Sequence, residues 1–162
     1  MMKVTKQLTA VAYHEAGHAI AMLDREIPFK YVTIQPSSDS LGYVQTDRGD
    51  LLRLAKLYAR RTKTPHFQLR MLNYAIVCLA GGEAEKRYRG RYNHVGADQD
   101  YRAAVNFVDH IAWDPDEIEL HLKLADFRAE LIIENRWDQV VTIAEALLEK
   151  QHLTDQEVIS LL

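Results

Sequence analysis

Residues 9–25 read TAVAYHEAGHAIAMLDR, and this stretch decides the fold because its neighbours must pack around it. Its apolar residues recur at the spacing of a helix: Ala12, Ala16, Ala19, Ile20 and Leu23. We therefore predict a helix from Thr9 to Arg25, which ends before Pro28. Gly17 lies in the middle of it. Glycine there costs about 1 kcal/mol relative to alanine, so we expect another backbone to pack closely against this position.

Two histidines lie four residues apart in this helix, with a glutamate directly after the first: His14, Glu15 and His18. Positions four apart project from the same helix face, so both imidazoles can reach one metal ion. The order is expected by chance only roughly 0.02 times in a chain of this composition. Zinc accepts imidazole nitrogen and lowers the pKa of water toward ~7. We therefore expect a zinc site at which Glu15 acts as general base.

A catalytic zinc site needs a third protein ligand, and the spacing leaves several carboxylates open. Asp24 follows His14 by ten residues, but the glycine that would turn the chain there is replaced by Ala21. The remaining candidates lie on later helices: Glu83, Glu85, Asp98 and Asp100. We interpret Asp98 as a helix N-cap. Asp100 shares a helical phase with apolar residues, so it is predicted to point inward, where a carboxylate needs a partner.

The rest of the chain predicts a mainly α protein of the α+β kind, a helical bundle with a small β-hairpin or short sheet beside the histidine helix. Strands are expected at 31–35 and 42–45, and a loop at 90–96. Helices are expected at 51–61, from Pro65 onward with an interruption at Gly81-Gly82, and at 98–113, 115–135 and 137–150. A capping box, Thr154-x-x-Glu157, opens the last helix. We find no linker and expect one domain, residues 1–162.

Composition excludes several classes of protein. The formal net charge is −3 over 162 residues, so no overall basic field attracts nucleic acid or an acidic membrane. The basic and aromatic run Lys86 to Tyr92 is interpreted as a solvated helix end. The single cysteine, Cys78, cannot form an internal disulfide. With no signal peptide and no apolar run of about 20 residues, we expect a cytoplasmic protein that uses no membrane.

Several motifs resemble the peptidase domain of the FtsH family, the AAA+ zinc metalloproteases. Residues 13–19, YHEAGHA, match that family's helix in full. Residues 32–36 with 41–43 are similar to its strand pair, and 79–85 (LAGGEAE) to its glycine-alanine-glutamate segment. Residues 96–100 (GADQD) resemble the stretch whose final aspartate is the third zinc ligand. The tail from 144 onward is similar too, so the resemblance covers nearly the whole chain.

The resemblance implies a zinc-dependent endopeptidase in which His14, His18 and Asp100 hold Zn²⁺ and Glu15 is the base. It implies a peptide or an unfolded protein segment as substrate. These 162 residues hold no Walker motif, so we expect either substrates that are already unfolded or a separate unfoldase. The relatives form hexamers, so a homo-oligomer is a further candidate.

Other roles were weighed beside this one. Glu85 is a candidate for orienting a ligand histidine, as opposed to a structural carboxylate. His94 is a candidate accessory residue, although we favour a loop histidine without a role. The strand at 31–35 could add an extended peptide to a sheet edge, or be purely structural.

Two rival functions remain. One is another zinc hydrolase such as a deformylase, but that class takes a cysteine ligand before the histidine pair, whereas Cys78 follows it. The second is a non-catalytic adaptor domain that is stabilised by metal.

Overall fold

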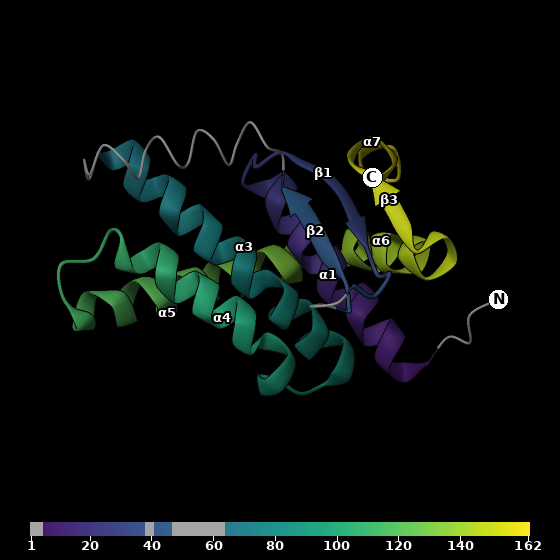
Figure 1. The fold of residues 1–162 in the computed structure, drawn as a ribbon, viewed down its shortest axis with the longest axis horizontal. Coiled ribbons are helices and arrows are strands. Elements are labelled where there is room, and N and C mark those ends of the chain that lie inside the picture. Colours follow the sequence, from purple (N-terminus) through teal and green to yellow (C-terminus); the bar gives the residue numbers. More distant parts are fainter. Residues whose placement is uncertain (1–4, 38–40, 47–63) are drawn as a thin grey trace.

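The computed structural model describes residues 5–37, 41–46 and 64–162. The predicted helix at 51–61 lies outside these residues. The described part contains six helices and three short strands in the chain order shown in Figure 1. The helices are α1 (Lys6–Asp24), α3 (Pro65–Arg89), α4 (His94–Asp109), α5 (Pro115–Asn135), α6 (Trp137–Lys150) and α7 (Asp155–Ser160). The strands are β1 (Phe29–Thr33), β2 (Tyr43–Thr46) and β3 (His152–Thr154). The expected mainly α fold with a small sheet is confirmed.

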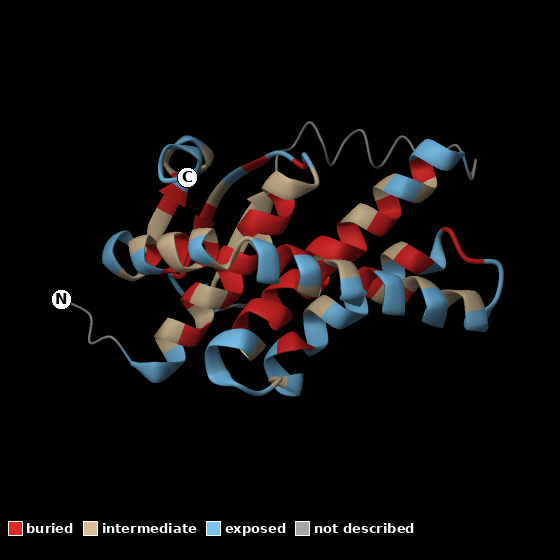
Figure 2. Cartoon of the chain, turned by 180° about the vertical axis from the view of Figure 1, so that it is seen from behind, coloured by how far each residue is buried: buried red, intermediate tan, exposed pale blue. Residues whose placement is uncertain are grey.

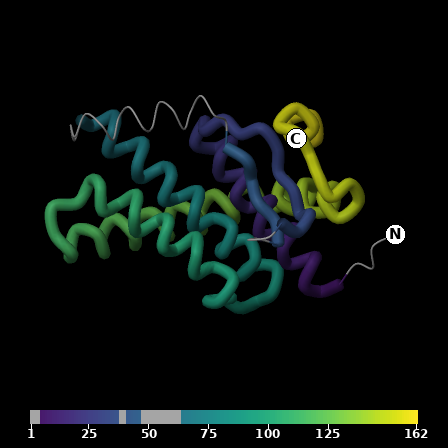
Figure 3. The backbone as a smooth tube through the Cα atoms, viewed as in Figure 1, coloured from purple at the N-terminus to yellow at the C-terminus, as the bar shows by residue number. Residues whose placement is uncertain are grey.

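Helix α1 lies at the centre of the fold, between α3 and α6 (Figure 3). Its small residues Ala12, Ala16 and Ala19 are fully buried, which lets neighbouring helices approach closely. At Gly17 a Cβ atom would lie 2.6 Å from the Ala80 carbonyl oxygen and 2.6 Å from Ala84 Cβ. The predicted close backbone contact is therefore confirmed, and the backbone that it meets belongs to α3.

Helix α3 runs without a break through Gly81 and Gly82, so the predicted interruption is wrong. Both glycines are buried where α3 crosses α1, and the packing there outweighs their low helix propensity. The helix ends at Gly90, which adopts the left-handed conformation with φ of 73°. Nineteen residues of α1 and 25 of α3 thus form the crossed pair on which the candidate site is built.

The sheet is antiparallel in the order β2-β1-β3. Val32 in β1 faces Val44 on one side and Leu153 on the other. The strand predicted at 31–35 is therefore central, with both edges paired, so of its two suggested roles the substrate edge is wrong and the structural strand agrees with the fold. In the described part of the chain β2 is an outer strand. Strand β3 has only three residues, too few to show an alternating pattern in the sequence.

Most helix boundaries follow capping chemistry. Thr5 caps α1, which therefore begins at Lys6 and not at Thr9. Asn93 caps α4 by accepting from the Gly96 amide, so the helix starts inside the predicted loop and Asp98 is not its N-cap. The bounds predicted for α5 and α6 are confirmed. The capping box of Thr154 and Glu157 is confirmed at α7.

The buried residues gather along the inner sides of the helices and under the sheet (Figure 2). The apolar core holds α1, α3 and the strands in one body. Among the described helices, none is long and apolar enough to cross a bilayer.

Candidate metal centre

Three side-chain donors from two helices, α1 and α4, converge beside the α1–α3 crossing. His14 Nε2 lies 3.0 Å from His18 Nε2 and 2.9 Å from Asp100 Oδ2, and His18 Nε2 lies 3.5 Å from that same oxygen. Donors held 2.0–2.1 Å from a tetrahedral zinc are about 3.3 Å apart. The three separations are close to this value, so the donors are near enough to one another to share one metal ion. Within the described residues, this is the group of histidine and acidic side chains that could hold such an ion.

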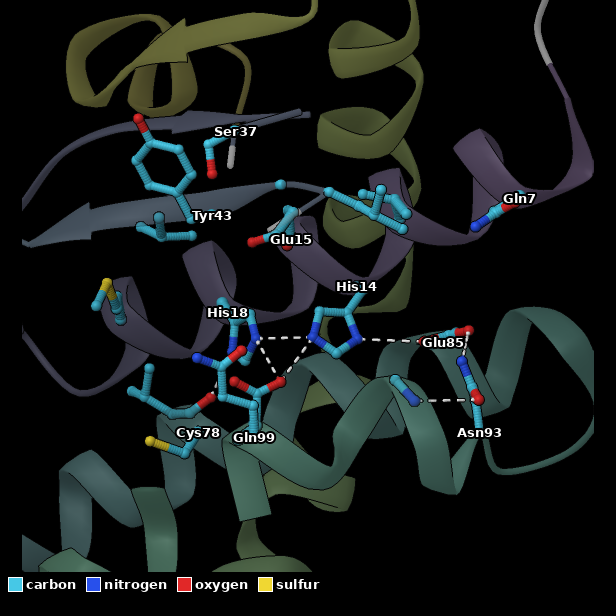
Figure 4. Close-up of a pocket in the computed structure, with 18 of the residues that line it drawn as sticks. Gln7, His14, Glu15, His18, Ser37, Tyr43, Cys78, Glu85, Asn93 and Gln99 are labelled. Atoms are coloured by element: carbon cyan, nitrogen blue, oxygen red, sulfur yellow. Dashed lines mark hydrogen bonds and ion pairs between the residues drawn. The ribbon is translucent and has the colours of Figure 1, made fainter. Parts of the chain in front are cut away.

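The far nitrogen of each histidine is held by an oxygen. His14 Nδ1 lies 3.3 Å from Glu85 Oε2, and His18 Nδ1 lies 2.8 Å from the Val77 carbonyl oxygen (Figure 4). Because both oxygens accept, each Nδ1 carries the hydrogen and each Nε2 can present its lone pair to the convergence point. Two lone pairs and a carboxylate oxygen at one point repel one another unless a cation lies between them. The donor set therefore fits a metal ion.

The acidic side chains around the histidines favour a positive charge at the point where the three donors meet. Burial lowers the pKa of His14, but hydrogen bonds to Asp100 and Glu85 outweigh burial and raise that pKa to about 10. Burial raises the pKa of Asp100, whereas the charge of His18 and the hydrogen bonds from both histidines hold it well below its ordinary value. A proton supplies the positive charge without metal, and a metal ion can take its place.

Gly81 leaves the space that the histidine rings occupy. A Cβ atom at this position would overlap with His18 Nε2 and would lie 2.8 Å from His14 Nε2. The absence of a side chain on α3 thus allows both rings of α1 to turn toward Asp100 of α4. From the sequence, Gly81 was expected to break a helical pattern and was noted in a segment of family resemblance, and neither observation predicted the space that it leaves for the rings.

Glu15 lies on the wall of the same cavity (Figure 4). It is buried, and burial raises its pKa while the charges of His18 and His14 lower it. Gly42, just before β2, packs on it: a Cβ there would lie 2.9 Å from Glu15 Cγ and 3.0 Å from Oε1. A carboxylate with a raised pKa, held beside a metal site, is suited to accept a proton near neutral pH.

The cavity has a volume of about 770 Å³ and is lined by residues of α1, the β2 region, α3 and α4. Gly42, Tyr43 and Val44 are among the lining residues, so the outer strand β2 lines the same cavity as the three donors. Val11, Met22 and Val77 add apolar surface. A space of this size next to a metal site can hold several residues of an extended chain.

The other sequence candidates for the third ligand lie elsewhere or have another partner. Asp24 pairs with Arg25 at 2.6 Å and with Arg136 at 3.2 Å. Glu83 pairs with Lys86, and the exposed Asp98 pairs with Arg102.

Three further residues considered from the sequence have structural surroundings of their own. Glu85 contacts His14, as the orienting role requires. His94 packs edge-on against Tyr92, with ring centroids 5.0 Å apart. Cys78 lines the cavity, and burial raises the pKa of its thiol to about 12, but its sulfur does not belong to the group of donor atoms that converge at His14, His18 and Asp100.

Two residues that contact Glu85 were not identified by the sequence analysis. The side-chain amide of Asn93 donates to Glu85 Oε1 at 3.0 Å, and Arg89 Nε lies 2.7 Å from that same oxygen. They hold the carboxylate whose other oxygen faces His14. Arg89 lies four residues after Glu85 on α3, a spacing that could have indicated the pair. The contact of Asn93 depends on the turn between α3 and α4, and no sequence pattern marks it.

Replacing Gly81 with alanine is expected to weaken Zn²⁺ binding by roughly 100-fold, because the new methyl group occupies the space of both ligand nitrogens. Gly82→Ala is the matched control: its methyl group meets only the end of the Tyr92 side chain, at 3.0 Å. Competition titration with a chromophoric chelator measures both affinities, and circular dichroism checks the fold. If the two variants bound Zn²⁺ with equal affinity, Gly81 would not be needed to leave space for the histidine rings.

Zinc affinity is expected to rise with pH. The metal-free site holds a proton on His14, whose pKa is raised to about 10, and zinc must displace it. Each released proton makes the apparent association constant increase about tenfold per pH unit below that pKa, so binding weakens as the pH falls. Chelator competition between pH 6 and pH 8 measures this slope. A constant affinity over that range would show that no proton is displaced from the donors.

Comparison with known proteins gives one distant relative. No family model matches the chain. The chain is 26% identical, over an alignment of 177 positions, to a protein named ATP-dependent zinc metalloprotease FtsH 2, from Thermoanaerobacter sp. (strain X514). The alignment covers 94% of this chain and 32% of that protein, so the chain spans about a third of the relative's length. The similarity indicates a distant relationship to an FtsH protein and a peptidase-like origin.

Proposed function

We propose that this chain is a zinc-dependent endopeptidase, with residues 1–162 forming a single FtsH-like peptidase domain. The observation that carries the proposal is the convergence of His14, His18 and Asp100 beside a buried Glu15 on the wall of an open cavity. A purely structural metal site needs no proton acceptor next to it, so Glu15 favours catalysis over the adaptor role. The distant similarity to a zinc metalloprotease supports the same reading.

In this proposal the chain holds the metal and moves a proton. His14, His18 and Asp100 are the ligands; Glu85 and the Val77 carbonyl oxygen accept from the two Nδ1 atoms and fix the rings. Zinc, when bound, supplies Lewis acidity, which polarises a carbonyl and eases the deprotonation of water. Glu15 accepts the proton of the attacking water on a carboxylate oxygen and then delivers it to the nitrogen of the leaving amine.

The outer strand β2 is the proposed guide for the substrate. Gly42, Tyr43 and Val44 border the cavity, and β2 is paired with β1 on one side. An extended peptide that adds to the other side of β2 would pass alongside Glu15 and the donors. Strand addition requires an unfolded segment, which agrees with peptides or unfolded proteins as substrates. Delivery by a separate unfoldase, and a cytoplasmic location, stay predictions.

Glu15→Gln is expected to reduce peptide-bond cleavage by about 10²–10⁴-fold while zinc binding is kept, because the amide cannot accept the proton. Glu83→Gln is the matched control, since Glu83 is also buried but pairs with Lys86 outside this cavity. Cleavage of a permanently unfolded protein is followed with zinc-loaded enzyme and with added chelator.

The outcomes separate the two functions. Equal cleavage by Glu15→Gln and wild type would contradict the mechanism. A wild-type protein that binds zinc but cleaves no unfolded substrate would favour the adaptor role.

A further inference from the structure

Helix α5 has apolar residues on two opposite faces. Its inner face buries Leu122, Ala125, Ala129 and Ile132 in the core. The opposite face carries four large apolar side chains, which we call the outer stripe: Leu120, Leu124, Phe127 and Leu131. Their exposed fractions are 65, 38, 56 and 38%. At about 100° per residue these four positions lie within one narrow band, on the side away from the core. Figure 2 shows exposed residues along this outward side of α5.

The outer stripe has the spacing of a helix–helix seam. Its residues follow one another by four, three and four positions, which is the a/d repeat of a coiled coil. Single exposed apolar residues are ordinary, but four in one continuous band indicate a surface that binds a partner. None of the four lines the cavity of the candidate metal centre. This surface is therefore separate from the proposed active site.

We propose that the outer stripe binds the same stripe of a second copy of this chain, with the two α5 helices antiparallel. A twofold axis near residues 125 and 126 then places Leu124 of one copy against Phe127 of the other, and Leu120 against Leu131. An interface of this kind is self-complementary, because each contact occurs twice. The apolar pattern of the stripe reads the same from either end, as such a pairing requires.

The flanking charges support this orientation. Lys123 and Glu130 lie on the same side of the stripe, directly before Leu124 and Leu131, at the flanking g positions that face each other across an antiparallel helix pair. In the antiparallel pair, Lys123 of each copy faces Glu130 of the other, so two opposite-charge contacts form. In a parallel pair, Lys123 would face Arg128 of the other copy, and like charges would repel. Glu130 lies 3.5 Å from Lys86 of its own chain, yet its side chain is 46% exposed and can reach a partner.

Sedimentation velocity over a range of concentrations tests the interface with the full chain. Wild type is expected to change from monomer to dimer as the concentration rises. Leu124→Asp is expected to weaken the dimer by at least roughly 30-fold, equivalent to about 2 kcal/mol at 1.4 kcal/mol per tenfold. Leu69→Asp is the matched control, since Leu69 is 53% exposed on α3. Unchanged zinc affinity and circular dichroism show that the variants are folded.

Charge reversal tests the orientation. Lys123→Glu is expected to weaken the dimer about 3- to 10-fold, and adding Glu130→Lys in the same chain is expected to restore it. Lys30→Glu, an exposed position on β1, should have no effect. A wild type that stays monomeric at its highest soluble concentration overturns the proposal, as does a dimer that survives Leu124→Asp. A dimer strengthened by Lys123→Glu would indicate parallel helices and overturn the antiparallel arrangement.

Discussion

The close crossing of α1 and α3 is the constraint on which the rest of the structure depends. Gly17 lets the two backbones come within contact distance, and Gly81 leaves room for the imidazoles of His14 and His18 at the same crossing. Larger residues at either position would separate the helices or occupy the space of the Nε2 atoms of His14 and His18. Because the apolar core packs around the crossing and an oxygen accepts from each Nδ1 atom, the two rings have a fixed position and direction where they face the cavity.

The charges at this crossing form one connected arrangement. Asp100 and Glu85 contact the two nitrogens of His14, and Arg89 with Asn93 holds the far oxygen of Glu85. Buried charges of one sign are costly unless they are matched, so two carboxylates near one imidazole call for a positive charge between them. The hydrogen bonds fix the atoms around that place. The same arrangement keeps Glu15 close to both histidines, whose charges lower the pKa of its carboxyl group.

The sequence predicted what local patterns encode. The bounds of α5 and α6 follow from periodicity together with Pro115 and the helix stop after Asn135, and the fold class was confirmed. The histidine pair could be assigned to one helix face from spacing alone. The unbroken course of α3 through Gly81 could not be predicted, because the reason is a contact with α1 that is distant in sequence. The central position of β1 depends in the same way on β3, a strand of three residues.

The position of Asp100, the third donor, could likewise not be predicted from local sequence patterns alone. Helical phase allowed Asp100 to point inward, but its distance from His14 depends on the turn between α3 and α4, where Asn93 caps the helix. Spacing left Glu83, Glu85 and Asp98 open, and only resemblance selected among them. In the structure these three meet Lys86, His14 Nδ1 and Arg102, whereas Asp100 reaches the shared point. Long-range packing thus determines which carboxylate completes the site.

X-ray absorption at the zinc edge, on the reconstituted full chain, tests the central claim most directly. Two histidine nitrogens, one carboxylate oxygen and a water predict four nitrogen or oxygen neighbours at about 2.0–2.1 Å, with imidazole scattering from two rings. The same spectrum of Asp100→Asn should lose this ordered first shell or the bound metal. A sulfur neighbour at about 2.3 Å, which would place Cys78 on the metal, or a shell without two imidazoles would contradict the account.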